Sequence, residues 1–125
     1  MRFFFMMLVF FISGCISPEA FQPPPSTYEQ WKKTGSSIND VKTAMLECGY
    51  PDWGAVGESP GNVARMERCM ENSGFVYSSR FGTFCKQQPN LSACQLNAVI
   101  PERSVQRRLE SRFCKKYPKA DVCQP

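Results

Sequence analysis

A cysteine pattern that occurs twice near the end of the chain limits the folds open to it more than any other feature. The pattern Phe-Cys-Lys-x-x-Pro-x-x-x-x-Cys covers residues 84–94, here called the first cysteine unit, and residues 113–123, the second cysteine unit. Two copies of one pattern are expected to fold alike, and a short loop loses the least entropy when it closes. We therefore predict that each unit closes on itself, through the disulfides Cys85–Cys94 and Cys114–Cys123.

The earlier cysteines Cys48 and Cys69 are then left to pair with each other. Three disulfides are typical of a small domain in an oxidising compartment. Six cysteines allow fifteen pairings in principle. The alternative with the clearest consequence is a Cys85–Cys114 crosslink, because it would join the two units instead of closing each one.

Metal binding and redox catalysis are both poorly supported by these cysteines. The chain contains no histidine, and the cysteine spacing inside each unit is far from the C-x₂₋₄-C spacing of structural zinc sites. No C-x-x-C pair is present to form a reactive dithiol. We expect the cysteines to be structural, with no metal ion and no cofactor.

The start of the chain has the layout of a signal peptide. Arg2 precedes ten apolar residues, 3–12, and this run is shorter than the stretch of about 20 that spans a bilayer. The sequence Ile12-Ser13-Gly14-Cys15 then resembles a bacterial lipobox. The resemblance implies that residues 1–14 are removed and that Cys15 is acylated, which anchors the mature protein to a membrane by its lipid. A conventional secreted protein, with Cys15 as a plain thiol near the cleavage site, is the alternative.

Residues 15–27 are expected to form an extended tether between the lipid and the folded domain, because the segment is rich in proline and poor in apolar residues. Ile16 follows Cys15, and by analogy with the sorting of enteric lipoproteins an Ile rather than an Asp favours the outer membrane. Residues 28–125 are long enough for one small domain, in which disulfides commonly supplement a modest core.

Two helices are predicted in the first half of this domain. Ser37 and Asp40 are placed as an N-cap and its N3 partner, and Gly49 is expected to end the helix that they begin. A second helix is expected to end at Gly74. The apolar positions recur at helical spacing and are Ile38, Val41, Met45 and Cys48 in the first helix and Val63, Met66, Cys69 and Met70 in the second. The predicted fold class is therefore mainly α, with a helical hairpin held by a disulfide.

The same part of the chain resembles a group of small bacterial envelope lipoproteins, many of them carried on prophage-like elements. In these proteins a tryptophan, a lysine and a glycine precede a cysteine-bearing helix, and the next helix ends in Cys-Met-x-x-x-Gly-aromatic. The matching residues are Trp31, Lys33, Gly35, Cys48, Cys69, Met70, Gly74 and Phe75. The resemblance implies a fold rather than an activity. The aromatic residues among them are expected in the core, with residues 75–77 forming a short strand against residues 28–32.

A further helix is predicted after Ile100, because Pro101 suits the first helical position and Val105, Leu109 and Phe113 recur as a narrow apolar stripe. The positive charge of the chain is concentrated in this region. Residues 101–125 hold seven basic residues against three acidic ones, whereas residues 15–100 hold seven against eight. This asymmetry favours an anionic partner, and the candidate binding residues are Arg103, Arg107, Arg108, Arg112, Lys115, Lys116 and Lys119.

The candidate partners of an exported, anchored protein are components of the cell envelope rather than nucleic acid. They are phosphorylated lipid A sugars, anionic lipid head groups and the acidic surface of another envelope protein. The alternative for any run of charge is a face that is merely solvated.

No enzyme is predicted, because the chain lacks histidine and shows no nucleophile motif and no paired carboxylates. The favoured function is a membrane-anchored binding or structural module of the envelope, related to phage-borne proteins that modify the cell surface. The alternative is an inhibitor of a lysozyme or a protease, presented on the loop 115–122 with Tyr117-Pro118-Lys119 at its tip. A disulfide loop suits that task because preorganisation lowers the entropy lost on binding.

Overall fold

The computed structural model describes residues 27–125, and the predicted signal peptide, Cys15 and the proline-rich segment up to residue 26 lie outside the described residues. The described elements follow one another as α1 (Thr27–Gln30), β1 (Trp31–Lys32), α2 (Ile38–Glu47), α3 (Pro60–Asn72), β2 (Val76–Tyr77), α4 (Phe84–Gln87), η2 (Ser92–Cys94), α5 (Val105–Leu109), α6 (Arg112–Lys116) and η3 (Asp121–Cys123). This part of the chain is mainly helical, with one short sheet and three disulfides, which confirms the predicted fold class.

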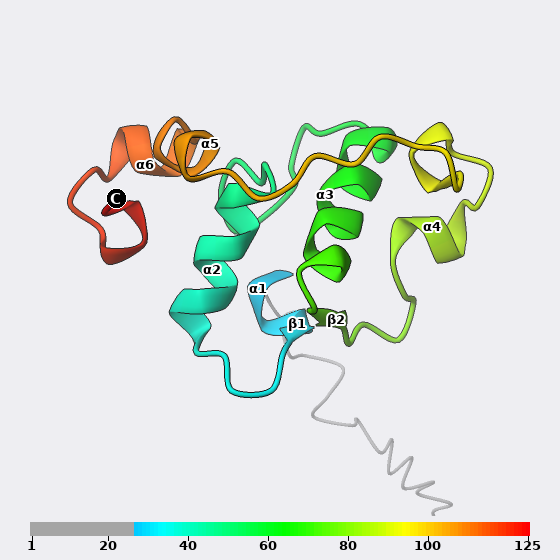
Figure 1. Ribbon diagram of the computed structural model, residues 1–125, viewed down its shortest axis with the longest axis horizontal. Coiled ribbons are helices and arrows are strands. Elements are labelled where there is room, and N and C mark those ends of the chain that lie inside the picture. Colours follow the sequence, from blue (N-terminus) through cyan, green and yellow to red (C-terminus); the bar gives the residue numbers. More distant parts are fainter. Residues whose placement is uncertain (1–26) are drawn as a thin grey trace, which may run out of the picture.

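Helices α2 and α3 lie antiparallel in the middle of the molecule and form the predicted hairpin (Figure 1). Ser37 caps α2 as expected: its hydroxyl accepts from the Asp40 N–H at 3.1 Å, and the Asp40 carboxylate accepts from the Ser37 N–H at 2.7 Å. Gly49 follows α2 with φ +102°, and Gly74 follows α3 with φ +89°. Both angles lie in the left-handed region, where a side chain is strained, so glycine allows the chain to turn sharply after each helix.

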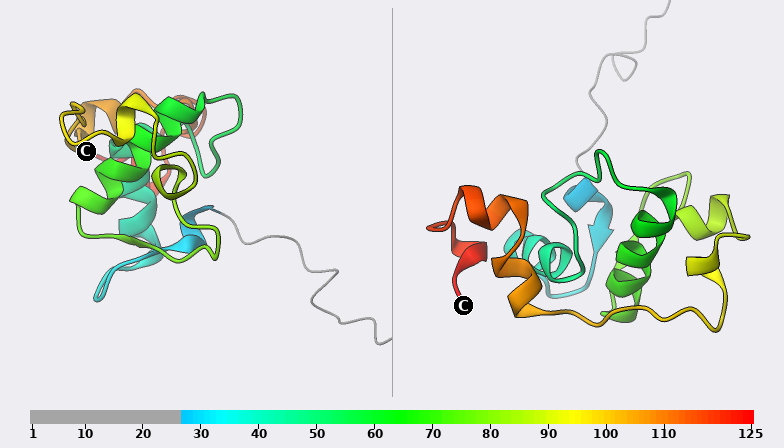
Figure 2. Two further views of the ribbon diagram at one scale, coloured as in Figure 1. Left: turned by 90° about the vertical axis from the view of Figure 1, so that its right-hand side faces the viewer. Right: turned by 90° about the horizontal axis from the view of Figure 1, so that it is seen from above.

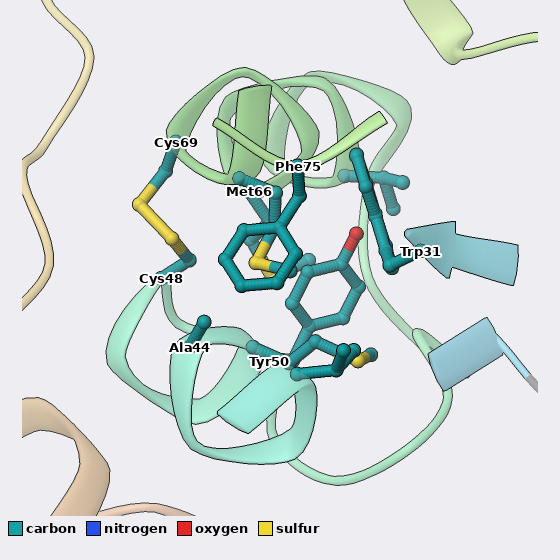
Figure 3. Close-up of a cluster of buried hydrophobic side chains, with 11 residues drawn as sticks. Trp31, Ala44, Cys48, Tyr50, Met66, Cys69 and Phe75 are labelled. Atoms are coloured by element: carbon teal, nitrogen blue, oxygen red, sulfur yellow. A yellow bond between two sulfur atoms is a disulfide. The ribbon is translucent and has the colours of Figure 1, made fainter. Parts of the chain in front are cut away.

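The main core fills the space between the hairpin and the short sheet (Figure 3). The Cys48–Cys69 disulfide lies at one edge of this core and Trp31 at the other, with the rings of Tyr50 and Phe75 between them. Trp31 is only 1% exposed, which agrees with its predicted place in the core. The buried members are Trp31, Val41, Ala44, Met45, Cys48, Tyr50, Val63, Met66, Cys69, Met70 and Phe75.

The short sheet forms within the two predicted segments but is shorter than predicted, because residues 28–30 belong to helix α1 and Phe75 lies outside β2. Strand β1 pairs with β2 in antiparallel register, with Trp31 opposite Tyr77 and Lys32 opposite Val76. The N–H of Ser78 donates to the carbonyl of Gln30 at 2.7 Å and extends the pairing beyond the sheet. So short a pair is stable only when it is packed, and here the Trp31 side chain packs it against the hairpin.

The helix predicted after Ile100 differs from the structure in two ways. Residues 101–104 are not helical, so Pro101 does not take the first helical position, and α5 begins at Val105 after Ser104, whose hydroxyl accepts from the Arg107 N–H at 3.2 Å. The helix also ends at Leu109, and Ser111 caps a separate α6. The cap at Ser104 makes the predicted helix begin later, and the cap at Ser111 divides it into α5 and α6. Each serine does this because its side chain offers the backbone a local hydrogen bond.

The predicted apolar stripe is also wrong for its two members in α5, whereas its third member, Phe113 in α6, packs partly buried against the core beneath the second cysteine unit. Val105 and Leu109 are 48% and 37% exposed, whereas Arg108 is buried, at 6%. The reason is a charge on α2: Glu47 is buried and its carboxylate accepts from the Arg108 Nε at 3.1 Å and from the Arg103 Nε at 2.7 Å. An ion pair, rather than apolar contact, therefore holds α5 against the hairpin.

The three disulfides join the pairs expected from the sequence, with Cα separations of 5.6 Å for Cys48–Cys69, 5.3 Å for Cys85–Cys94 and 5.4 Å for Cys114–Cys123. The two cysteine units lie at opposite ends of the molecule, and the hairpin separates them (Figures 1 and 2). A second, smaller core forms under the second unit, from Leu46, Cys114, Val122 and Cys123.

Candidate binding site

The two cysteine units are alike in structure as well as in sequence, down to their hydrogen bonds. An arginine from a neighbouring helix donates to two carbonyls at the end of each unit. Arg68 donates to Ala93 and Gln95 at 2.7 and 3.0 Å, and Arg108 donates to Val122 and Gln124 at 2.5 and 2.6 Å. The guanidinium groups thus fix both units in place, since charge-assisted hydrogen bonds are stronger than neutral ones.

The glutamine that follows each unit closes the loop a second time. The Gln95 amide donates to the carbonyls of Pro89 and Leu91 at 3.0 and 3.3 Å, and the Gln124 amide donates to those of Pro118 and Ala120 at 3.2 and 3.4 Å. A disulfide, an arginine and a glutamine therefore hold each loop rigid, and each loop presents its tip preorganised.

The tips themselves differ. The first unit carries Gln88-Pro89-Asn90-Leu91, and the second carries Tyr117-Pro118-Lys119-Ala120. Beside the second tip lies a hollow of about 600 Å³ with an apolar lining of Phe113, Tyr117, Pro118, Lys119 and Ala120. The second unit thus combines a rigid loop with an open apolar surface, which is the usual composition of a binding site.

A row of aromatic rings leads away from this hollow. The ring centroids of Tyr117 and Phe113 are 5.1 Å apart, those of Phe113 and Trp53 are 4.7 Å apart, and those of Trp53 and Tyr28 are 6.4 Å apart. Trp53 comes from the loop between α2 and α3, which is joined to α6 by a hydrogen bond of 3.0 Å from the Phe113 N–H to the Pro51 carbonyl. Three segments that are distant in sequence therefore build one surface.

Charged groups accompany the row of rings. The Lys116 Nζ lies 5.3 Å from the Tyr117 ring centroid, and the Lys42 Nζ lies 4.4 Å from that of Tyr28. Arg112 pairs with Asp52, and both border a second hollow of about 360 Å³ that Trp53, Gly54, Phe113, Lys116 and Tyr117 also line. Burial acts to raise the pKa of Asp52, but hydrogen bonds from the Gly54 N–H and from Arg112 outweigh it, so its pKa lies below the usual value.

The seven basic residues predicted as one binding surface fall into two groups. Arg103, Arg107 and Arg108 are used inside the protein: the first and third pair with Glu47, and Arg107 donates to the carbonyls of Glu47 and Glu102 at 2.5 and 2.9 Å. Arg112, Lys116 and Lys119 border the two hollows, and the exposed Lys115 lies beside them on α6. The structure thus separates the three arginines that are engaged with the main fold from the basic residues at or beside the two hollows, of which Arg112 also pairs with Asp52.

Trp53 is the member of the site that sequence reasoning missed, together with its neighbour Tyr28. The only local signal is a tryptophan among turn-forming residues, in Pro51-Asp52-Trp53-Gly54, where an apolar side chain has no helix or strand to bury it. In the structure Trp53 is partly buried against the second, smaller core, and the part of its ring that stays accessible borders the smaller of the two hollows.

Comparison with known proteins gives no match: no family model, no curated protein and no solved structure corresponds to the chain. Within residues 27–125, no helix has both the length and the apolar character that crossing a bilayer requires. The site is therefore interpreted from its own residues. Its side chains offer aromatic faces, cations and one carboxylate, a set that suits recognition of a ligand.

Proposed function

We propose that this protein is a lipid-anchored, non-enzymatic binding module of the bacterial cell envelope. Its anchor is the lipid on Cys15, which the lipobox-like sequence supports, and the sorting analogy based on Ile16 supports the outer membrane as its location. The resemblance to prophage-borne lipoproteins supports a role in modifying the surface of the host cell. The three disulfides support an oxidising compartment.

The binding face in this proposal is the second cysteine unit with the adjoining row of rings. The observation that carries it is the contrast between two units of one design. Both are fixed by a disulfide, an arginine and a glutamine, but the first carries Gln88 where the second carries Tyr117, and Tyr117 borders an apolar hollow. Because the two units share one scaffold and differ at the tip, we infer that the tip of the second unit has a binding role that the scaffold alone does not provide.

The alternative is an inhibitor, in which the same tip inserts into the active site of a lysozyme or a protease. The apolar surface beside Tyr117 is shallow and open, and it continues into the row of rings outside the loop. A surface that extends beyond the loop favours a binding module over a loop that acts alone.

The proposal is tested in two steps. Intact-mass analysis of the protein extracted from membranes, under non-reducing conditions, should show a lipid mass that Cys15→Ser abolishes and six oxidised thiols. A photocrosslinking residue placed at Tyr117 should then capture an envelope component on cells, whereas the same residue at Gln88, the matching position of the first unit, should capture none. An unlipidated chain, or equal capture from both positions, would contradict the proposal.

A further inference from the structure

We propose that the two hollows around Tyr117 bind an acidic sugar, that is, a sugar ring that carries a phosphate or a carboxylate. This inference rests on the proposed function and specifies its ligand. It follows from three properties of the site: where the rings are exposed, where the cations lie, and how few polar atoms line the larger hollow.

Two aromatic rings that border the hollows supply stacking surfaces. Tyr117 is 49% exposed and borders both hollows, and Trp53 borders the smaller one. A pyranose has one face made of C–H groups, which packs on an aromatic ring, while its hydroxyls stay in water or meet polar groups at the rim. The smaller hollow offers such a rim in Asp52, Arg112 and Lys116.

The charges around the hollows favour a ligand that carries a negative charge. Arg112, Lys116 and Lys119 border them, against the single carboxylate of Asp52. The Arg112 side chain is 61% exposed although it pairs with Asp52, so part of its guanidinium faces water and is open to a ligand. A guanidinium recognises phosphate and carboxylate by paired hydrogen bonds, and the two lysines add charge without fixed geometry.

An acidic peptide is a poorer fit to the same surface. Its backbone would bring N–H and C=O groups against the larger hollow, whose lining from Phe113 to Ala120 is apolar. Buried peptide groups without partners are costly. A sugar avoids this cost because its apolar face is the one that enters.

The test uses the fluorescence of Trp53 in the full-length protein purified from membranes and reconstituted in phosphatidylcholine nanodiscs, so that no detergent competes for the hollow. The other tryptophan, Trp31, is 1% exposed in the core and gives a constant background. Four probes separate the contributions: N-acetylglucosamine 1-phosphate, N-acetylmuramic acid, neutral N-acetylglucosamine and inorganic phosphate.

At least one of the two acidic sugars should bind about ten-fold or more tightly than both the neutral sugar and inorganic phosphate, since one charge-assisted contact is worth roughly one decade in affinity. Which acidic sugar responds tells whether the source is a phosphorylated or a carboxylated glycan. Trp53→Phe should remove the ligand-induced change in fluorescence, while the emission of Trp31 remains. Arg112→Gln should weaken the acidic sugar and leave the neutral one unchanged, and Tyr117→Ala should weaken both.

The matched control is Gln88→Ala in the first cysteine unit, which should bind like the unmodified protein. The far-ultraviolet circular dichroism of every variant should match that of the unmodified protein. Equal binding of acidic and neutral sugars, equal binding of inorganic phosphate, or no response to any probe would overturn the inference. If capture from position 117 on cells still succeeds in that case, the assignment of an acidic sugar fails while the proposed binding function stands. If capture fails too, both fail.

Discussion

Glu47 is expected to be the most sensitive polar residue of the described domain, and Glu47→Gln tests this. The substitution keeps the size of the side chain and removes its charge. Arg108, which is 6% exposed, then keeps its bonds to Val122 and Gln124 but loses the carboxylate that neutralises it. Breaking a buried ion pair from one side costs about 3–5 kcal/mol. Because the amide oxygen of glutamine still accepts one hydrogen bond, we expect a loss at the lower end, about 3 kcal/mol.

Arg103→Gln is the matched control. It removes the other partner of the same carboxylate, but the Arg103 side chain is 36% exposed and Glu47 keeps Arg108. Pairs with this exposure contribute about 1 kcal/mol or less. The assay is equilibrium unfolding in urea under non-reducing conditions, followed by tryptophan fluorescence. A loss within about 0.5 kcal/mol of zero for Glu47→Gln, the range of ordinary surface changes, would refute the reasoning, and so would a loss in Arg103→Gln as large as that in Glu47→Gln.

Three further predictions address other parts of the molecule. Burial raises the pKa of Glu67 from 4.5 to about 7, with Glu71 adding to the rise and the Phe84 N–H opposing it. The folded state then binds the proton more tightly than the unfolded state. The free energy of unfolding should therefore fall as the pH rises from about 4.5 to 7, by no more than about 1.4 kcal/mol per pH unit. Urea titrations across that range should show this slope in the unmodified protein and not in Glu67→Gln. Removing the Cys114–Cys123 disulfide with two serines should lower stability by about 2.6 kcal/mol, the loop-closure value for a separation of 9 residues, and should weaken capture from position 117. Serines at Cys85 and Cys94, which have the same separation, should cost a similar amount and leave capture unchanged. Gly49→Ala should lower the free energy of unfolding by about 1–2 kcal/mol, because φ is +102° at that position. Gly61 lies in α3 with ordinary space for a methyl group, so Gly61→Ala should stabilise the protein slightly. Thermal melts that rank the two variants the other way would contradict the assignment of backbone strain.

Much of the fold could be predicted from the sequence because its signals are local. The cap at Ser37 and Asp40 and the glycines that follow the two long helices each act within a few residues, and the structure has them where the sequence predicts them. The repeat also gave the right disulfides, because two loops of equal length and similar composition close in the same way.

The errors arise where the deciding partner is distant. Nothing near Arg108 shows that it is buried, because its carboxylate, Glu47, lies 61 positions earlier in the chain. Apolar spacing therefore predicted the wrong buried face for α5. The candidate site is hidden for the same reason: Trp53 and Phe113 meet only because the loop after α2 is bound to α6. The tip at Tyr117 was found from sequence, and its aromatic neighbours were not.

The way in which each cysteine unit is held has a consequence for how such a protein can change. The fixing bonds go to backbone carbonyls, from Arg68 and Gln95 in one unit and from Arg108 and Gln124 in the other. A carbonyl is present whatever the side chain, so most tip residues are replaceable without loss of the anchor. Each unit is therefore expected to tolerate substitutions at its tip while the disulfide and the hydrogen bonds that fix it stay the same.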